Sequence, residues 1–147
     1  MNFAFTGPRK LNEQELIAVW NHLFDIPYKL HHWHVGDAKG LDETVQRFAA
    51  TLAIKLTIHE VTHHQPWGFA ERSQRMVNQL GPEDKLIAFP NKPCPESCSP
   101  TSPFCGHGSG TWGTMAYAAK HNIQIQVIPL VDIDLPPWLN HQQLNLF

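Results

Sequence analysis

The stretch LHHWHVGDAKGLDETVQRFAATLAIKLTIHEV, residues 30–61, contains a complete strand, helix and strand pattern. Residues 30–35 form a short run typical of a buried strand. Apolar residues then recur at helical spacing from Leu41 to Leu52, and residues 56–61 form the next predicted strand. Strands connected in this way run parallel, because a parallel crossover needs a helix to bring the chain back. This stretch therefore predicts an α/β fold.

The same alternation continues along the rest of the chain. Further strands are predicted at residues 3–6, 85–90 and 123–130, and further helices after Asn12, at residues 69–80 and at residues 111–121. Asn12 and Glu15 have the spacing of a capping box at the start of the first helix. One apolar face of that helix is predicted from the spacing of Leu16, Val19, Trp20, Leu23 and Phe24.

These elements predict a single Rossmann-like three-layer sandwich with a mainly parallel sheet of about five strands. We interpret residues 1–147 as one domain with its core at residues 3–130. A loop rich in proline and cysteine occupies residues 91–107, and a C-terminal tail at residues 131–147 is expected to dock Trp138 and Leu139 on the core.

Composition limits the classes of partner. The 147 residues are 42% hydrophobic and carry a net charge of −2, so no global basic field attracts nucleic acid, although a local basic patch remains open. No apolar run is long enough for a membrane span and the N-terminus has no signal-peptide pattern, so we expect a cytoplasmic protein without a membrane partner. The five tryptophans favour a homodimer or a larger homo-oligomer.

The predicted binding site lies beyond the carboxyl ends of the strands, where open parallel sheets bind ligands. The segment GSGT, residues 108–111, precedes a predicted helix, and its backbone N–H groups could surround a phosphate. Arg9 and Arg72 would add guanidinium donors to the phosphate oxygens. A valine at Gly110 is expected to block the anion and to disfavour the backbone of the turn. The alternative is that the glycines serve only a tight connection.

Five segments in order then carry a resemblance to a known group. They are FTGPR (5–9), HVGDAKGLDETVQRFA (34–49), AERSQRMV (70–77), LIAFP (86–90) and GSGTWGTMAYA (108–118). In this order they resemble the SLOG superfamily of Lonely Guy and DprA-like proteins, and most closely its small stand-alone YspA-like branch. The resemblance implies a Rossmann-like fold and a nucleotide-like ligand. The residues that it implies for binding are Gly7, Arg9, Gly36, Lys39, Gly40, Arg72, Ser73, Gly108, Ser109, Gly110 and Thr111.

Two departures from the family pattern affect the expected function. Ser73 replaces the asparagine of an Arg-Asn pair, and Thr114 replaces the glutamate that Lonely Guy enzymes need for hydrolysis. We therefore expect a sensor or binding module for a nucleotide or nucleotide-derived ligand. The alternative is a Lonely Guy type hydrolase of a glycosidic or phosphate bond, with acid–base groups near Asp42, Glu71 and His107. Asp42 is also expected to cap its helix. Single-stranded DNA binding, as in DprA, is a weaker third interpretation because a basic aromatic stripe is lacking.

The sequence does not assign a cofactor, and zinc is the alternative considered. Cys94, Cys98, Cys105 and His107 are ligand types that suit zinc, but their irregular spacing favours reduced thiols over a zinc site. The remaining clustered histidines are interpreted as surface or core residues rather than metal ligands; they are His32, His34, His59, His63 and His64.

Overall fold

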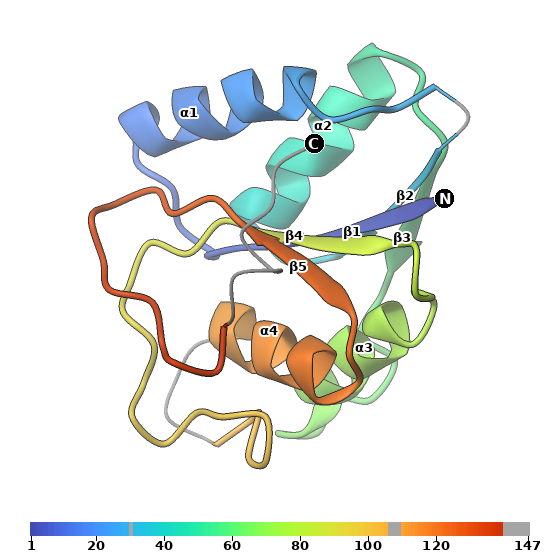
Figure 1. The fold of residues 1–147 in the computed structure, drawn as a ribbon. Coiled ribbons are helices and arrows are strands. Elements are labelled where there is room, and N and C mark those ends of the chain that lie inside the picture. Colours follow the sequence, from blue (N-terminus) through green and yellow to red (C-terminus); the bar gives the residue numbers. More distant parts are fainter. Residues whose placement is uncertain (30, 106–109, 140–147) are drawn as a thin grey trace.

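A computed structural model describes residues 1–29, 31–105 and 110–139, and it has one five-stranded sheet between two layers of helices (Figure 1). All pairs of neighbouring strands are parallel and lie in the order β3-β2-β1-β4-β5. The strands are β1 (Asn2–Thr6), β2 (His32–Gly36), β3 (Leu56–His59), β4 (Lys85–Ala88) and β5 (Gln124–Val127). The predicted α/β class and the five parallel strands are confirmed.

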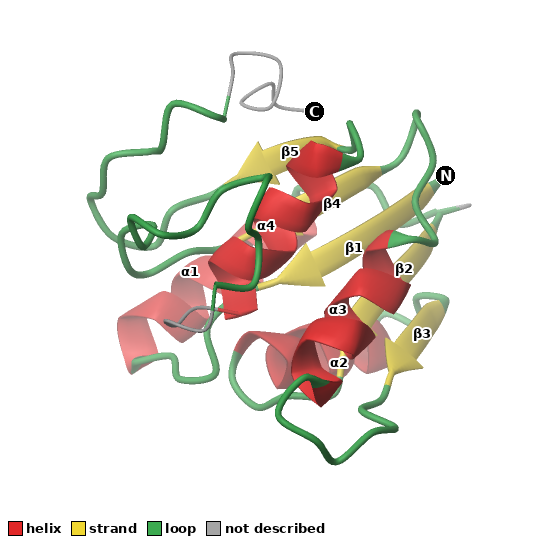
Figure 2. Cartoon of the chain, turned by 90° about the horizontal axis from the view of Figure 1, so that it is seen from below, coloured by secondary structure: helices red, strands yellow, loops and turns green. Residues whose placement is uncertain are grey.

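The helices pack in pairs on opposite faces of the sheet (Figures 1 and 2). Helices α1 (Glu13–Phe24) and α2 (Leu41–Thr51) cover one face, and α3 (Gly68–Val77) and α4 (Gly110–Lys120) cover the other. Each face has its own buried core, with Trp33 and Phe48 prominent on the first and Trp112 and Met115 on the second. The sheet is therefore covered by helices on both faces, as parallel sheets usually are.

The order of the strands reverses at the centre of the sheet. The chain runs outward from β1 to β3, returns through α3, and adds β4 on the other side of β1. The backbone N–H of Phe89, after β4, donates to the carbonyl of Thr6 at 3.0 Å. The loops after β1 and β4 diverge from this point, which makes it the expected place for a ligand.

Helix α1 begins as predicted, but its apolar residues divide between two sides. The backbone N–H of Glu15 donates to the Asn12 side chain at 2.8 Å, and the Asn12 N–H donates to Glu15 at 3.0 Å, which confirms the capping box. Val19 and Leu23 are buried, whereas Leu16 and Phe24 are 41% and 55% exposed, so the prediction of a single apolar face is wrong for these two. Leu16 and Phe24 therefore lie partly in solvent, and the homo-oligomer stays a prediction.

The C-terminal tail packs on the core beside α4. The Trp138 ring lies 6.1 Å from the Trp112 ring at nearly a right angle, and Leu139 is buried, as predicted. None of the helices within the described ranges is both long and apolar enough to cross a lipid bilayer.

Candidate functional site

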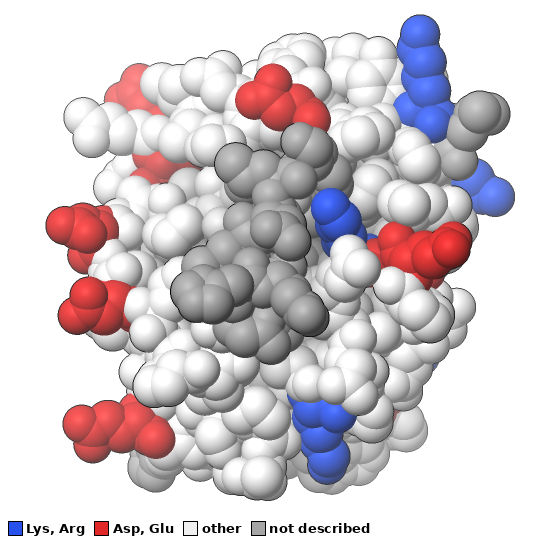
Figure 3. Space-filling model, in the orientation of Figure 1, with Lys and Arg blue, Asp and Glu red and all other residues white. Residues whose placement is uncertain are grey.

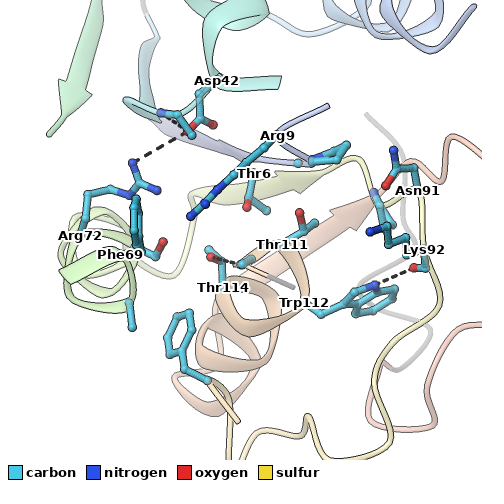
Figure 4. Close-up of a pocket in the computed structure, with 18 of the residues that line it drawn as sticks. Thr6, Arg9, Asp42, Phe69, Arg72, Asn91, Lys92, Thr111, Trp112 and Thr114 are labelled. Carbon is cyan, nitrogen blue, oxygen red and sulfur yellow. Dashed lines mark hydrogen bonds and ion pairs between the residues drawn. The ribbon is translucent and has the colours of Figure 1, made fainter. Parts of the chain in front are cut away.

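A pocket of about 550 Å³ lies at the carboxyl ends of β1 and β4 (Figure 4). Thr6 and Gly7 come from the end of β1, Asn91 and Lys92 follow β4, and the first turn of α4 completes this side. The start of α2 and the first turns of α3 form the other side. The pocket therefore occupies the point where the strand order reverses, as the sequence predicts.

The two turns that carry the first family segments pack directly against each other. The backbone N–H of Leu41 donates to the carbonyl of Pro8 at 3.0 Å. Gly40 has a φ of +73°, and a Cβ there would overlap the backbone of Pro8 and Arg9. Only glycine fits this position, because the left-handed backbone and the close approach both exclude a side chain. Gly40 therefore supports the pocket wall without lining it.

The buried Arg72 of α3, which lines the pocket, pairs with Asp37 of the loop after β2, which lies outside the lining. The Arg72 side chain is 8% exposed, and its Nη1 contacts Asp37 Oδ1 at 2.5 Å and lies 3.9 Å from Asp42 Oδ2. Asp37 is fixed in turn by the backbone N–H of Val61, which donates to its second oxygen at 3.0 Å. A Cβ at Gly36 would overlap both Arg72 and Asp42, so glycine is needed beneath this cluster. The predicted phosphate donor Arg72 is thus already engaged by carboxylates.

Asp42 is a buried carboxylate in the pocket wall. Its Oδ2 accepts the backbone N–H of Ala38 at 3.1 Å, while its Oδ1 accepts no hydrogen bond from any described residue. Burial raises the pKa of Asp42 to about 6, although the nearby Arg72 charge opposes this rise. The expected helix cap is wrong, because Gly40 is the N-cap residue and no side chain caps this helix. Asp42 instead holds the loop before the helix.

The cations around the pocket exceed its carboxylates. The Arg9 guanidinium lies 4.3 Å from the centre of the Phe69 ring, and Figure 4 shows Arg9 extending across the pocket. Lys10 and Lys92 also line it, and none of these three side chains forms an ion pair within the described chain. On the face seen in Figure 3, acidic groups lie mainly along the left edge and basic groups lie in the right half. The pocket is therefore locally basic in a chain of net charge −2.

Three threonines line the middle of the pocket (Figure 4). Thr6 and Thr111 are 7% and 6% exposed, and their hydroxyls make no hydrogen bond with a described residue. Thr114 is fully buried, and its hydroxyl donates to the carbonyl of Gly110 at 2.7 Å. The Thr6 and Thr111 hydroxyls therefore remain accessible to a ligand, whereas the Thr114 hydroxyl is used within α4.

The structure brings most of the predicted site residues to this pocket. Six of them line it: Gly7, Arg9, Arg72, Ser73, Gly110 and Thr111. Gly36 and Gly40 lie against lining residues, Lys39 is exposed and outside the lining, and Gly108 and Ser109 lie outside the described residues. A Cβ at Gly110 would meet open space, and its φ is not left-handed, so the expected backbone requirement at this position is wrong.

Sequence reasoning missed the aromatic and loop residues of the lining. Phe69, Phe104 and Lys92 all face the pocket. The indole N–H of Trp112 donates to the Lys92 carbonyl at 2.8 Å, which fastens the loop after β4 to α4. No periodic pattern marks these residues in the sequence, although Phe69 stands next to the family segment that carries Arg72.

The structure does not bring the acid–base candidates of the hydrolase alternative together in the pocket. Glu71 lies outside the pocket lining and forms an ion pair with Arg75 at 3.0 Å. The hydrogen bond from Arg75 lowers the pKa of Glu71. His107 lies outside the described residues. Asp42 is therefore the one acid–base candidate that the described chain brings to the pocket.

The cysteines of the loop after β4 are close to one another. Cys98 Sγ donates to the Pro103 carbonyl at 3.2 Å, and Ser97 donates to Cys105 Sγ at 3.1 Å. Burial raises the pKa of Cys98 to about 12 and also raises that of Cys94. Within the described ranges, no three His, Cys, Asp or Glu side chains could hold a metal ion. The zinc alternative that includes His107 stays a prediction.

Two of the clustered histidines belong to a buried polar row under α3. His34 Nδ1 lies 3.0 Å from His59 Nε2, and His34 Nε2 lies 2.9 Å from Asn2 Oδ1. Burial lowers the pKa of His34 to about 4 and also lowers that of His59. His34 and His59 are buried, in agreement with a core role, and neither lines the pocket.

Comparisons with known proteins found no relative for this chain. No protein-family model matches it, and neither the curated proteins nor the solved structures contain a match. The resemblance to the SLOG superfamily therefore stays a prediction that rests on the sequence segments.

Proposed function

We propose that the protein binds a nucleotide or a nucleotide-derived ligand in the pocket at the carboxyl ends of β1 and β4. The observation that carries this proposal is the Arg9 guanidinium, which forms no ion pair with a described residue, in a pocket that also holds the Thr6 hydroxyl at the end of β1 and the Thr111 hydroxyl at the start of α4. An anionic group suits this arrangement, because cations, hydroxyl donors and a helix N-terminus all favour negative charge.

The pocket also offers room and apolar surface for the rest of such a ligand. Its volume of about 550 Å³ falls within the range of small-molecule sites. Phe69 is 47% exposed, and Phe104 lies on the same lining. Aromatic rings are suitable surfaces for a nucleobase, since every base has a flat π face. The likeness of the sequence segments to nucleotide-binding SLOG proteins supports the same class of ligand.

A hydrolase remains the alternative, and Asp42 is the observation in its favour. A buried carboxyl group whose pKa is about 6 could transfer a proton near neutral pH. Thr114 counts against hydrolysis, because its hydroxyl is bonded to Gly110 and no carboxylate occupies that position. Incubation of the protein with AMP, followed by chromatography for free adenine, distinguishes turnover from binding.

The test of binding is calorimetric titration of AMP, ADP and GMP into the wild type and the Arg9→Ala variant. We expect Arg9→Ala to weaken binding about tenfold to a hundredfold, because each charge-assisted contact contributes about 1.5 to 3 kcal/mol. Arg47→Ala is the matched control, since the Arg47 side chain is 70% exposed on α2 and outside the lining. Equal affinities for the wild type and Arg9→Ala contradict the proposal.

A further inference from the structure

We propose that Asp42 Oδ1 accepts a hydrogen bond from a sugar hydroxyl of the ligand, so that the pocket selects ribose phosphates over their deoxy analogues. This inference rests on the proposed function and deepens it, because it names the group next to the phosphate that the pocket recognises.

The first support is the unsatisfied oxygen of Asp42. The residue is 7% exposed, it lines the pocket, and its Oδ2 is held by the backbone N–H of Ala38. Oδ1 accepts nothing from the described chain. Oδ1 is accessible to solvent rather than sealed inside the protein, so a ligand hydroxyl can take the place of water there. The free oxygen adjoins the pocket, so a donor on a bound ligand can supply the missing hydrogen bond.

The second support is that Arg72 does not need Asp42 as its partner. Arg72 Nη1 lies 2.5 Å from Asp37 Oδ1 but 3.9 Å from Asp42 Oδ2, which is too long for a hydrogen bond. Asp37 therefore supplies the principal ion pair. The Ala38 N–H and the nearby Arg72 charge hold the Asp42 carboxylate in place.

The third support is the position of Asp42 relative to the cations. Asp42 is the one carboxylate along a described lining that also carries Arg9, Lys10 and Lys92. Arg9 is close enough for its charge to lower the pKa of Asp42. An anionic group held by Arg9 therefore places the adjoining part of the ligand near Asp42. In a nucleotide that part is the sugar, whose hydroxyls are hydrogen-bond donors. A site built around such a hydrogen bond discriminates strongly against the analogue that lacks the hydroxyl.

The test titrates AMP, 2′-deoxy-AMP and 3′-deoxy-AMP into the wild type, Asp42→Asn and Asp37→Asn, with thermal unfolding as a check of folding. We expect the wild type to bind AMP about tenfold to a hundredfold more tightly than at least one deoxy analogue. Asp42→Asn should lose most of this preference. Its amide oxygen must still face the Ala38 N–H, so the NH₂ group replaces the acceptor in the pocket.

Asp37→Asn is the matched control, because it makes the same change of charge beside Arg72 but does not line the pocket. It should keep the preference for AMP. Equal binding of AMP and both deoxy analogues by the wild type overturns the inference and leaves the proposed function intact. An equal loss of preference in both variants also overturns it, since the effect would then pass through Arg72. Failure of the wild type to bind AMP, ADP or GMP overturns both proposals.

Discussion

Replacement of Gly36 by alanine tests how closely the pocket lining is packed around Arg72 and Asp42. Gly36 ends β2, and a Cβ there would overlap both Arg72 Nη1 and Asp42 Oδ2. Its φ is outside the left-handed region, so alanine adds a steric conflict without backbone strain. Arg72 is held by Asp37 and cannot move away without weakening that ion pair. Overpacking of this kind costs about 1 to 3 kcal/mol.

Part of that cost is offset because alanine reduces the entropy of the unfolded chain by about 0.4 to 1 kcal/mol. We therefore expect Gly36→Ala to lower the free energy of unfolding by about 1 to 2 kcal/mol and the Tm by roughly 3 to 8 °C. Differential scanning calorimetry measures the Tm, and urea unfolding measures the free energy. AMP affinity should fall as well, because the displaced Arg72 and Asp42 belong to the pocket lining.

Gly110→Ala is the matched control for the same chemical change at the same pocket. Among the described residues outside its own helix turn and chain neighbours, a Cβ at Gly110 would meet no atom within 4 Å. Alanine favours helix over glycine, so stability should stay the same or rise by up to about 1 kcal/mol. The packing argument is refuted if Gly36→Ala is as stable as the wild type, or if both variants lose stability equally.

Two further predictions concern groups outside the pocket. Because burial lowers the pKa of His34 to about 4, the folded state binds fewer protons than the unfolded state between about pH 6.5 and pH 4, and stability should fall as the pH decreases through this window. Urea unfolding at several pH values measures this dependence. The loss of unfolding free energy between pH 6.5 and pH 4 should be smaller in His34→Gln than in the wild type by about 2 kcal/mol, a figure already reduced for solvent screening. The same loss of free energy in both proteins would contradict this prediction. Because burial raises the pKa of Cys98 to about 12, iodoacetamide at neutral pH should modify Cys98 only after unfolding. Peptide mass spectrometry detects the modified residue, and rapid labelling of the folded protein would show this reasoning to be wrong.

The fold is largely predictable from the sequence because each element carries a local signal. The Asn12 and Glu15 capping box and the apolar run of β1 depend on neighbouring residues alone. Strand ends are less predictable: residues 123–130 are predicted as a strand, whereas β5 spans only Gln124–Val127. Beyond β5, the backbone N–H of Leu130 still donates to the carbonyl of Pro90, outside the regular strands. Apolar composition alone therefore cannot predict the residue at which strand pairing ends.

The site is only partly predictable, because ion pairs between residues far apart in the sequence decide which charged side chains remain for a ligand. The sequence predicts Arg9, and with it Arg72, as phosphate donors. The structure separates them, since Asp37 pairs with Arg72 across 35 residues of chain while Arg9 packs on Phe69 without an ion pair among the described residues. Asp42 was expected as a helix cap, a local role, and its position in the pocket depends on the contact between the turns after β1 and β2.

Our proposal of binding rather than turnover rests on a chemical argument. Release of a base requires a group that activates water or stabilises developing charge at the sugar. Thr114, at the position of the Lonely Guy glutamate, is bonded to Gly110 and carries no charge. The remaining candidate, Asp42, is fixed by Ala38 and has one oxygen free. Above a pH of about 6 the Asp42 carboxyl group is mainly ionised, so its free oxygen suits a hydroxyl donor on a ligand. We therefore propose that Asp42 selects the ligand by its sugar hydroxyl, and the AMP incubation decides whether it also takes part in turnover.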